Sequence, residues 1–292
     1  MKAKTLLLLV PSALMLIGCN GDIGKSSETP DFVETDLAGA RARLKAIDAK
    51  VNAADFVLPT KGLVKKDAKL KTVVNSSTTK EATVIQNVAF DLNENDPYLH
   101  SFNNDGEGEI KETWLYKDTS GEYIAAYDTS KATVDESGSS TQTNTKTYTK
   151  TLDSTSFMTD TFNPAADRLE VDENNIKKLI KETPSSILES LDSYEQWLSS
   201  SAVASDVAEG EFKFYLGKGE GDIKVEATET MKSNDGTLST IEMCSVFTDY
   251  MLSSSYVSMP IFGSSMVIDM EYKWGEVEKT YPTIADFTEV TE

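Results

Sequence analysis

The last third of the chain alternates apolar and polar side chains at the period of a β-strand, and this pattern restricts the fold more than any other feature. In residues 266–274 every second side chain is Met, Ile, Tyr or Trp, and most of the side chains between them are charged. Residues 212–216 and 223–228 alternate in the same way. Each such strand buries one face and exposes the other. Turn-forming residues at 217–221 and 234–236 lie nearby, so neighbouring strands are expected to be antiparallel.

More strands are predicted in the first half of the chain and near residue 250. Alternation is clear over residues 83–92. Further strands are predicted over residues 110–116 and 122–127, because turn-forming residues at 103–106 and 119–121 separate them. An apolar run predicts another strand over residues 246–252. The Ser-, Gly- and acid-rich residues 135–140 predict an exposed loop.

Helical periodicity appears in two other regions. A helix is predicted from Asp36 to Ala54, where apolar residues recur every three or four positions. Asn174 is expected to cap a helix over residues 176–181, and Thr183-Pro184 predicts the start of the next helix. One face of that helix is broad and apolar, and it carries Ile187, Leu191, Tyr194 and Leu198. Such a face must cover something, and a sheet is the obvious candidate.

The amino terminus has the features of a secretory signal. Lys2 and Lys4 precede an apolar segment that ends in Leu16-Ile17-Gly18-Cys19, which resembles a bacterial lipobox. The alternative is an uncleaved membrane helix over residues 5–17. That segment is shorter than the roughly 20 residues that span a bilayer, and a proline interrupts it.

The lipobox resemblance implies that Cys19 carries a diacylglyceryl group and attaches the protein to a membrane. Two or more acyl chains hold a protein stably, whereas one chain is marginal. Residues 1–18 are then the signal peptide, residues 19–31 a lipidated tether, and residues 32–292 one extracytoplasmic domain in the bacterial envelope. Asn20 favours the outer membrane if the source has two membranes.

The charge balance excludes some partners. With 28 Lys+Arg against 48 Asp+Glu, the chain has a formal net charge of -20. Such a surface repels phosphate backbones, so no nucleic-acid partner is expected. It repels anionic lipid headgroups as well. The body is therefore expected to stand off the membrane on its tether, and the sequence identifies no protein partner.

Residues that commonly carry chemistry are scarce. The chain has two cysteines and one histidine. Cys19 is assigned to the lipid, and Cys244 lies in an apolar run typical of a buried free thiol, although a reactive thiol is the alternative. His100 has no partners of metal-ligand or catalytic spacing, so it is interpreted as an ordinary strand or loop residue. No metal, cofactor or catalytic residue is predicted.

Methionines gather in the last third of the chain. A flexible thioether fills irregular cores, and it also lines surfaces that accept variable apolar ligands. Core filling and a hydrophobic ligand cavity are both consistent with the pattern. The residues are Met231, Met243, Met251, Met259, Met266 and Met270.

The order of elements behind a lipobox resembles the bacterial lipoprotein-carrier superfamily of the LolA/LolB and LppX/LprG types. The resemblance covers residues 33–290. It implies an α+β fold, in which a curved antiparallel sheet forms an unclosed half-barrel and helices cover its concave face. The cavity between sheet and helices would accept acyl chains. Ile187, Leu191, Tyr194 and Leu198 would then line the helical lid, and Met266, Ile268, Met270 and Trp274 the concave face.

The sequence therefore favours a non-enzymatic, lipid-anchored envelope protein that binds or shuttles an apolar or acylated molecule. A second hypothesis is a surface-exposed structural or interaction lipoprotein whose sheet core is fully packed. A third is an envelope hydrolase, which would need clustered carboxylates in a cleft.

Overall fold

The computed structural model describes residues 31–75, 78–93, 95–134, 140–151, 176–199, 207–232, 238–261 and 264–290. The strands form one sheet in the order β1-β8-β9-β10-β11-β12-β2-β3-β4-β5-β6-β7-β13, whose first and last strands are not joined. Every described strand register is antiparallel except that of β13 with β7. The predicted α+β class with an unclosed antiparallel sheet is therefore confirmed. No helix within these residues is both long enough and apolar enough to cross a bilayer.

The bounds of the elements follow the chain from the amino terminus. The strands and helices are β1 (Val33–Thr35), α2 (Leu37–Val51), β2 (Lys61–Asn75), β3 (Thr78–Asp91), β4 (Tyr98–Asn104), β5 (Glu109–Lys117), β6 (Tyr123–Val134), β7 (Ser140–Thr151), the π-helix η1 (Lys178–Glu182), α5 (Thr183–Ser199), β8 (Val207–Leu216), β9 (Ile223–Lys232), β10 (Leu238–Thr248), β11 (Met251–Ile261), β12 (Ser264–Trp274), the 3-10 helix η2 (Ile284–Asp286) and β13 (Thr288–Glu289).

Contacts divide the chain into two compact units. Unit 1 comprises Met1–Leu58, Lys69–Glu81 and Asn174–Glu271, and unit 2 comprises the remaining three segments, Pro59–Ala68, Ala82–Glu173 and Tyr272–Glu292. Both helices α2 and α5 belong to unit 1, whereas the β3–β7 meander lies mostly in unit 2. The single domain expected over residues 32–292 stays a prediction.

Helix α2 forms where the sequence predicts it. The side chain of Asp36 caps its first turn by accepting a hydrogen bond from Gly39 N at 2.8 Å. The side chain of Asn52 donates to Asp48 O at 3.1 Å at the other end. The face that packs inward is fully buried and consists of Ala40, Leu44, Ile47 and Val51.

The second helical region is continuous rather than split at Thr183. Pro184 has no backbone N–H and its ring clashes with the carbonyl four residues before it, so the preceding turn widens into η1. Thr183 has helical backbone angles and its hydroxyl donates to Leu179 O at 2.6 Å. The prediction that Thr183 caps a new helix is therefore wrong. Asn174, the expected cap of residues 176–181, lies outside the described residues.

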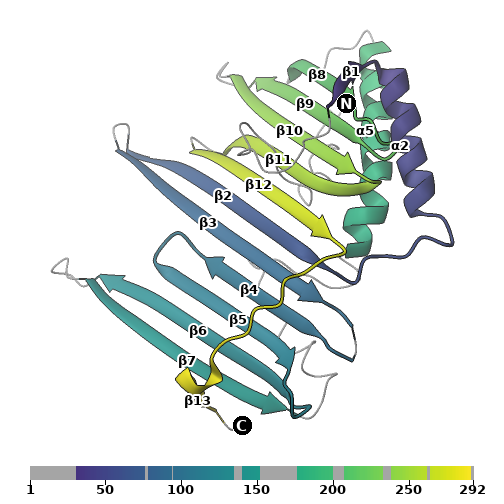
Figure 1. Cartoon of the computed structure of the whole chain (residues 1–292). Helices are drawn as coiled ribbons and strands as arrows, with labels where there is room; N and C mark the ends of the chain where they lie inside the picture. Colours follow the sequence, from purple (N-terminus) through teal and green to yellow (C-terminus); the bar gives the residue numbers. More distant parts are fainter. Residues whose placement is uncertain are drawn as a thin grey trace, which may run out of the picture. The chain divides into compact units, whose positions relative to one another are not determined.

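Polar contacts join α5 to α2, and the two helices lie side by side (Figure 1). Arg41 of α2 forms ion pairs with Asp192 and Glu195 of α5, the second at 2.8 Å. The hydroxyl of Ser185 donates to Asp48 Oδ1 at 2.5 Å. These contacts and the buried face of α2 hold the helices as one layer against the strands of unit 1.

One predicted strand is wrong. Residues 246–252 contain the turn between β10 and β11, at Asp249 and Tyr250, instead of one strand. Both residues have left-handed φ angles, 50° and 67°. A tight hairpin needs such angles, and asparagine, aspartate or glycine usually provides them. The sequence does not indicate this turn, because Tyr250 is aromatic and aromatic residues are typical of strands.

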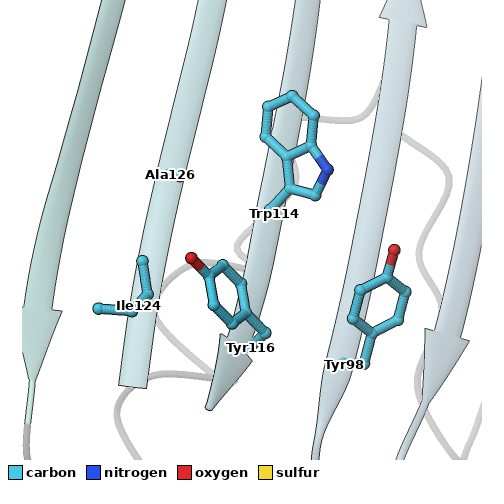
Figure 2. Packing of buried hydrophobic residues seen from close by; sticks show 5 residues of the cluster. All are labelled: Tyr98, Trp114, Tyr116, Ile124 and Ala126. Carbon is cyan, nitrogen blue, oxygen red and sulfur yellow. The ribbon is translucent and has the colours of Figure 1, made fainter. Parts of the chain in front are cut away.

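In unit 2, the carboxyl-terminal segment crosses one face of the meander (Figure 1). We call residues 275–290 the strap. The strap starts at Gly275, whose N–H donates to Lys61 O at 2.9 Å, and ends in β13, which pairs with β7. Val277, Ile284 and Phe287 of the strap pack on a core cluster that Figure 2 shows rising from β4, β5 and β6. The cluster consists of Tyr98, Trp114, Tyr116, Ile124 and Ala126.

Candidate functional site

One side of the unit 1 sheet faces the helices. The ring of Phe212 on β8 lies 4.8 Å from that of Tyr194 on α5, centroid to centroid. The Tyr194 hydroxyl also donates to Gly210 O at 3.4 Å. Side chains of directly paired residues point to the same side of a sheet. The strand register therefore shows which residues share this helix-facing side.

A single row crosses strands β8 to β12 of unit 1 on the helix-facing side. Phe212 pairs with Ala227, Ala227 with Met243, Met243 with Val257, and Val257 with Ile268. All five side chains are apolar. Ile268 thus lies on the same side of the sheet as Phe212, the residue that contacts α5.

Methionines flank this row on the same side. Met259 pairs with Met266, and Met270 lies two residues beyond Ile268 on β12. None of them is fully buried. Partly exposed thioethers can adjust to the shape of an apolar partner. The partly exposed methionines on this side are Met231, Met243, Met259, Met266 and Met270, whereas Met251 points to the other side.

The predicted lid residues have different environments. Leu191 is fully buried, whereas Ile187 and Tyr194 are partly exposed. The backbone of Leu198 belongs to α5, but its side chain lies outside the described residues. Trp274 belongs to unit 2, where its ring stacks on Tyr272 at 5.8 Å. A ligand-binding role for these residues stays a prediction.

A buried acid also lies on the helix-facing side. Glu229 pairs with Gly210 and Ile241, and only 9% of it is exposed. Burial raises the pKa of Glu229 above its ordinary value of 4.5, because the charged form loses water. Glu229 thus gives the helix-facing side of strands β8 to β12 a titratable position.

We expect Glu229→Gln to stabilise the protein by about 1 kcal/mol at pH 7–8, a typical single-site effect. Because the pKa of Glu229 is higher in the folded state, its protonation contributes to the stability of the protein, and this contribution is complete below pH 4.5. The contribution is lost as the pH rises through the folded-state pKa. Glutamine avoids the charge, so its advantage should shrink as pH falls towards 4.5. Urea unfolding at several pH values measures the difference, and Glu189→Gln, at an exposed position on α5, is the control. An advantage that grows on acidification would contradict the prediction.

The second candidate site is a pocket of about 1220 Å³ within unit 2. It lies on the side of the sheet that the strap crosses. Its polar and charged residues come from several strands and from the strap. The lining consists of Lys61, Leu63, Lys65, Asn87, Ala89, His100, Phe102, Glu112, Lys273, Trp274, Glu276, Val277, Glu278 and Thr280. Of the ligand-binding residues predicted from sequence, Trp274 alone is among those that line this pocket.

His100 is more closely partnered than the sequence indicates. Its Nε2 lies 2.6 Å from Glu112 Oε1, and its Nδ1 lies 3.3 Å from Thr280 Oγ1. Its ring stacks on Trp114 at 5.0 Å, with 5° between the planes. The sequence does not predict this arrangement, because the pairing of β4 with β5 brings Trp114 and Glu112 close to His100. Thr280 comes from a remote segment of the chain.

The Thr280 hydroxyl, the His100 imidazole and the Glu112 carboxylate follow one another in the order of a catalytic nucleophile, base and acid. Thr280, however, has another role. Its backbone N–H donates to the Tyr98 hydroxyl at 2.9 Å, and that hydroxyl donates to Thr280 O, also at 2.9 Å. The neighbouring Lys279 pairs with Asp91 at 3.1 Å and with Asp96 at 2.7 Å. These contacts anchor the strap. Among the described residues, no group of three or more His, Cys, Asp or Glu could hold a metal ion.

Comparison with known proteins adds little to this geometry. No family model and no curated protein matches the chain. A solved DUF1329 family protein from Desulfovibrio piger is similar with a TM-score of 0.23 and 9% identity, over 82% of this chain and 94% of that one. MucB, solved in complex with MucA(peri), has a TM-score of 0.12 and 10% identity, over 81% and 94%. Likenesses this distant assign neither fold nor function.

Proposed function

We propose that this chain is a non-enzymatic, lipid-anchored envelope protein that binds or shuttles an apolar or acylated ligand on the helix-facing side of unit 1. One observation carries the proposal. The register places Phe212, Met243 and Ile268 in one apolar row, on the side that contacts α5. The methionines around the row are only partly buried, so they can contact a guest molecule.

Two features of the sequence support the proposal. The lipobox at residues 16–19 would hold the protein at a membrane surface, where acylated molecules are abundant. The resemblance to the lipoprotein-carrier superfamily implies the same ligand class. A side lined with Met, Ile, Val and Phe favours acyl chains over polar ligands, because burial of apolar area contributes about 25 cal/mol per Å².

Native mass spectrometry of the purified mature protein tests the proposal. A bound lipid is expected, and Met266→Gln together with Met270→Gln should reduce its occupancy several-fold, because the amides lose their water on binding. Val267→Gln is the matched control, since Val267 lies between these positions on the opposite side of β12. Absence of lipid from the wild-type protein, or equal losses in the double variant and in Val267→Gln, would contradict the proposal.

A structural or interaction lipoprotein with a packed core is the alternative. The near-complete burial of Leu191 and Ile268 favours it, because a filled interface leaves these side chains no ligand to contact. On this alternative, affinity capture would recover one protein partner and no lipid would be extracted. Lipid uptake in proportion to protein concentration would exclude it.

A further inference from the structure

The pocket of unit 2 contains opposite charges that do not neutralise one another. Lys61 belongs to β2, and Glu276 and Glu278 belong to the strap. Within the part of the chain that the structure describes, none of the three forms an ion pair. Elsewhere in unit 2 the acids mostly have local partners, as Asp128 has in Lys146 at 2.8 Å. The pocket thus keeps both signs of charge available to a ligand.

The floor of the pocket is partly apolar. Leu63 lies between Lys61 and Lys65 on β2, and Phe102 pairs with Glu112 across β4 and β5. Asn87 pairs with Phe102 and offers both a donor and an acceptor. A ligand in this pocket would meet an apolar surface, an amide and charges of both signs within one volume.

We infer that this pocket binds a short extended peptide that carries both an amino and a carboxylate side chain. Lys61 would contact the carboxylate, and Glu276 and Glu278 the amino group. The apolar floor would take an aliphatic or aromatic side chain between them, and Asn87 would bond the peptide backbone. A volume of about 1220 Å³ exceeds the 300–1,000 Å³ of common small-molecule sites, so several residues fit.

Other ligand classes fit the lining less well. Polyanions are disfavoured, because Glu276 and Glu278 line the pocket and the chain has a net charge of -20. An acyl chain would strip water from Lys61 and Asn87 without replacing their hydrogen bonds. Sugars commonly stack on open aromatic faces, but one face of Trp274, the tryptophan in the lining, already stacks on Tyr272 at 5.8 Å.

This site is independent of the proposed acyl-binding side, because its lining residues all belong to unit 2. A library of capped pentapeptides, built from Lys, Glu, Leu, Phe and Ala, is screened against the purified mature protein by fluorescence anisotropy. Peptides with both Lys and Glu are expected to bind at least tenfold more tightly than peptides with one sign of charge. Lys61→Glu, and separately Glu276→Lys with Glu278→Lys, should each weaken the best peptide about tenfold.

The control carries the same kind of charge reversal away from the pocket. Lys45 on α2 and Glu189 on α5 are both exposed and belong to unit 1, so Lys45→Glu with Glu189→Lys should leave peptide binding unchanged. Urea unfolding checks that each variant is folded. Three results would overturn the inference: no peptide binds the wild-type protein, the pocket variants bind as the wild type does, or neutral oligosaccharides bind in place of charged peptides.

Discussion

Cys19→Ser is expected to abolish acylation of the protein. Serine has no thiol, so the thioether that the lipobox resemblance implies cannot form. Metabolic labelling with radioactive palmitate measures the effect, and the label should fall to background. The wild-type mature protein should partition with membranes, because two or more acyl chains give stable attachment. Each methylene group buried in the bilayer contributes about 0.8 kcal/mol to membrane binding.

The second cysteine provides the matched control. Cys244 lies in β10, is 7% exposed and has no disulfide. Cys244→Ser should therefore keep the full palmitate label. A wild-type chain that carries no label, and that stays in the membrane with residues 1–18 intact, would contradict the anchor and support an uncleaved membrane helix instead.

Tyr98→Ala is expected to destabilise unit 2 by about 3–5 kcal/mol, the cost of deleting a large buried aromatic side chain. Tyr98 is fully buried, and its ring forms a T-shaped pair with that of Tyr281, with 5.6 Å between the ring centroids. Its hydroxyl holds the backbone of Thr280 through two hydrogen bonds. Urea unfolding measures the loss, and amide hydrogen exchange over the strap should accelerate in parallel.

Tyr98→Phe separates the hydroxyl from the ring. It keeps the packing but removes the hydrogen bonds to the N–H and C=O of Thr280, an exposed residue, so a loss of about 0.5–1.5 kcal/mol is expected. Exchange should then increase mainly at residues 279–281. If Tyr98→Phe changes neither stability nor exchange, the hydroxyl does not anchor the strap.

The sequence predicts the elements in which local pattern and tertiary environment agree. Strands β9 and β12 follow the alternation over 223–228 and 266–274, and α2 begins directly after Asp36. Strand β2 is different, because lysines occupy much of it and hide its alternation. Its buried side, which includes Gly62 and Val64, is evident only once its neighbours are known.

The two candidate sites differ in how much of each could be predicted. The helix-facing side of unit 1 follows from alternation within each strand, so the common side of Met266, Ile268 and Met270 was predictable. The unit 2 pocket depends on a contact between residues 180 positions apart, His100 and Thr280. No local pattern encodes such a contact. The strap segment is polar and lacks strand periodicity, so the sequence gives no sign that it crosses a sheet.

Under the proposed lipid anchor, strand β1 has a mechanical consequence. It is three residues long, it pairs only with β8 among the described strands, and it directly precedes α2. Tension applied through the amino-terminal segment reaches β1 before any other strand. A short edge strand opens at low free energy compared with the rest of a sheet. The detachment of β1 would therefore lengthen the tether under load while β8 to β12 keep their pairing.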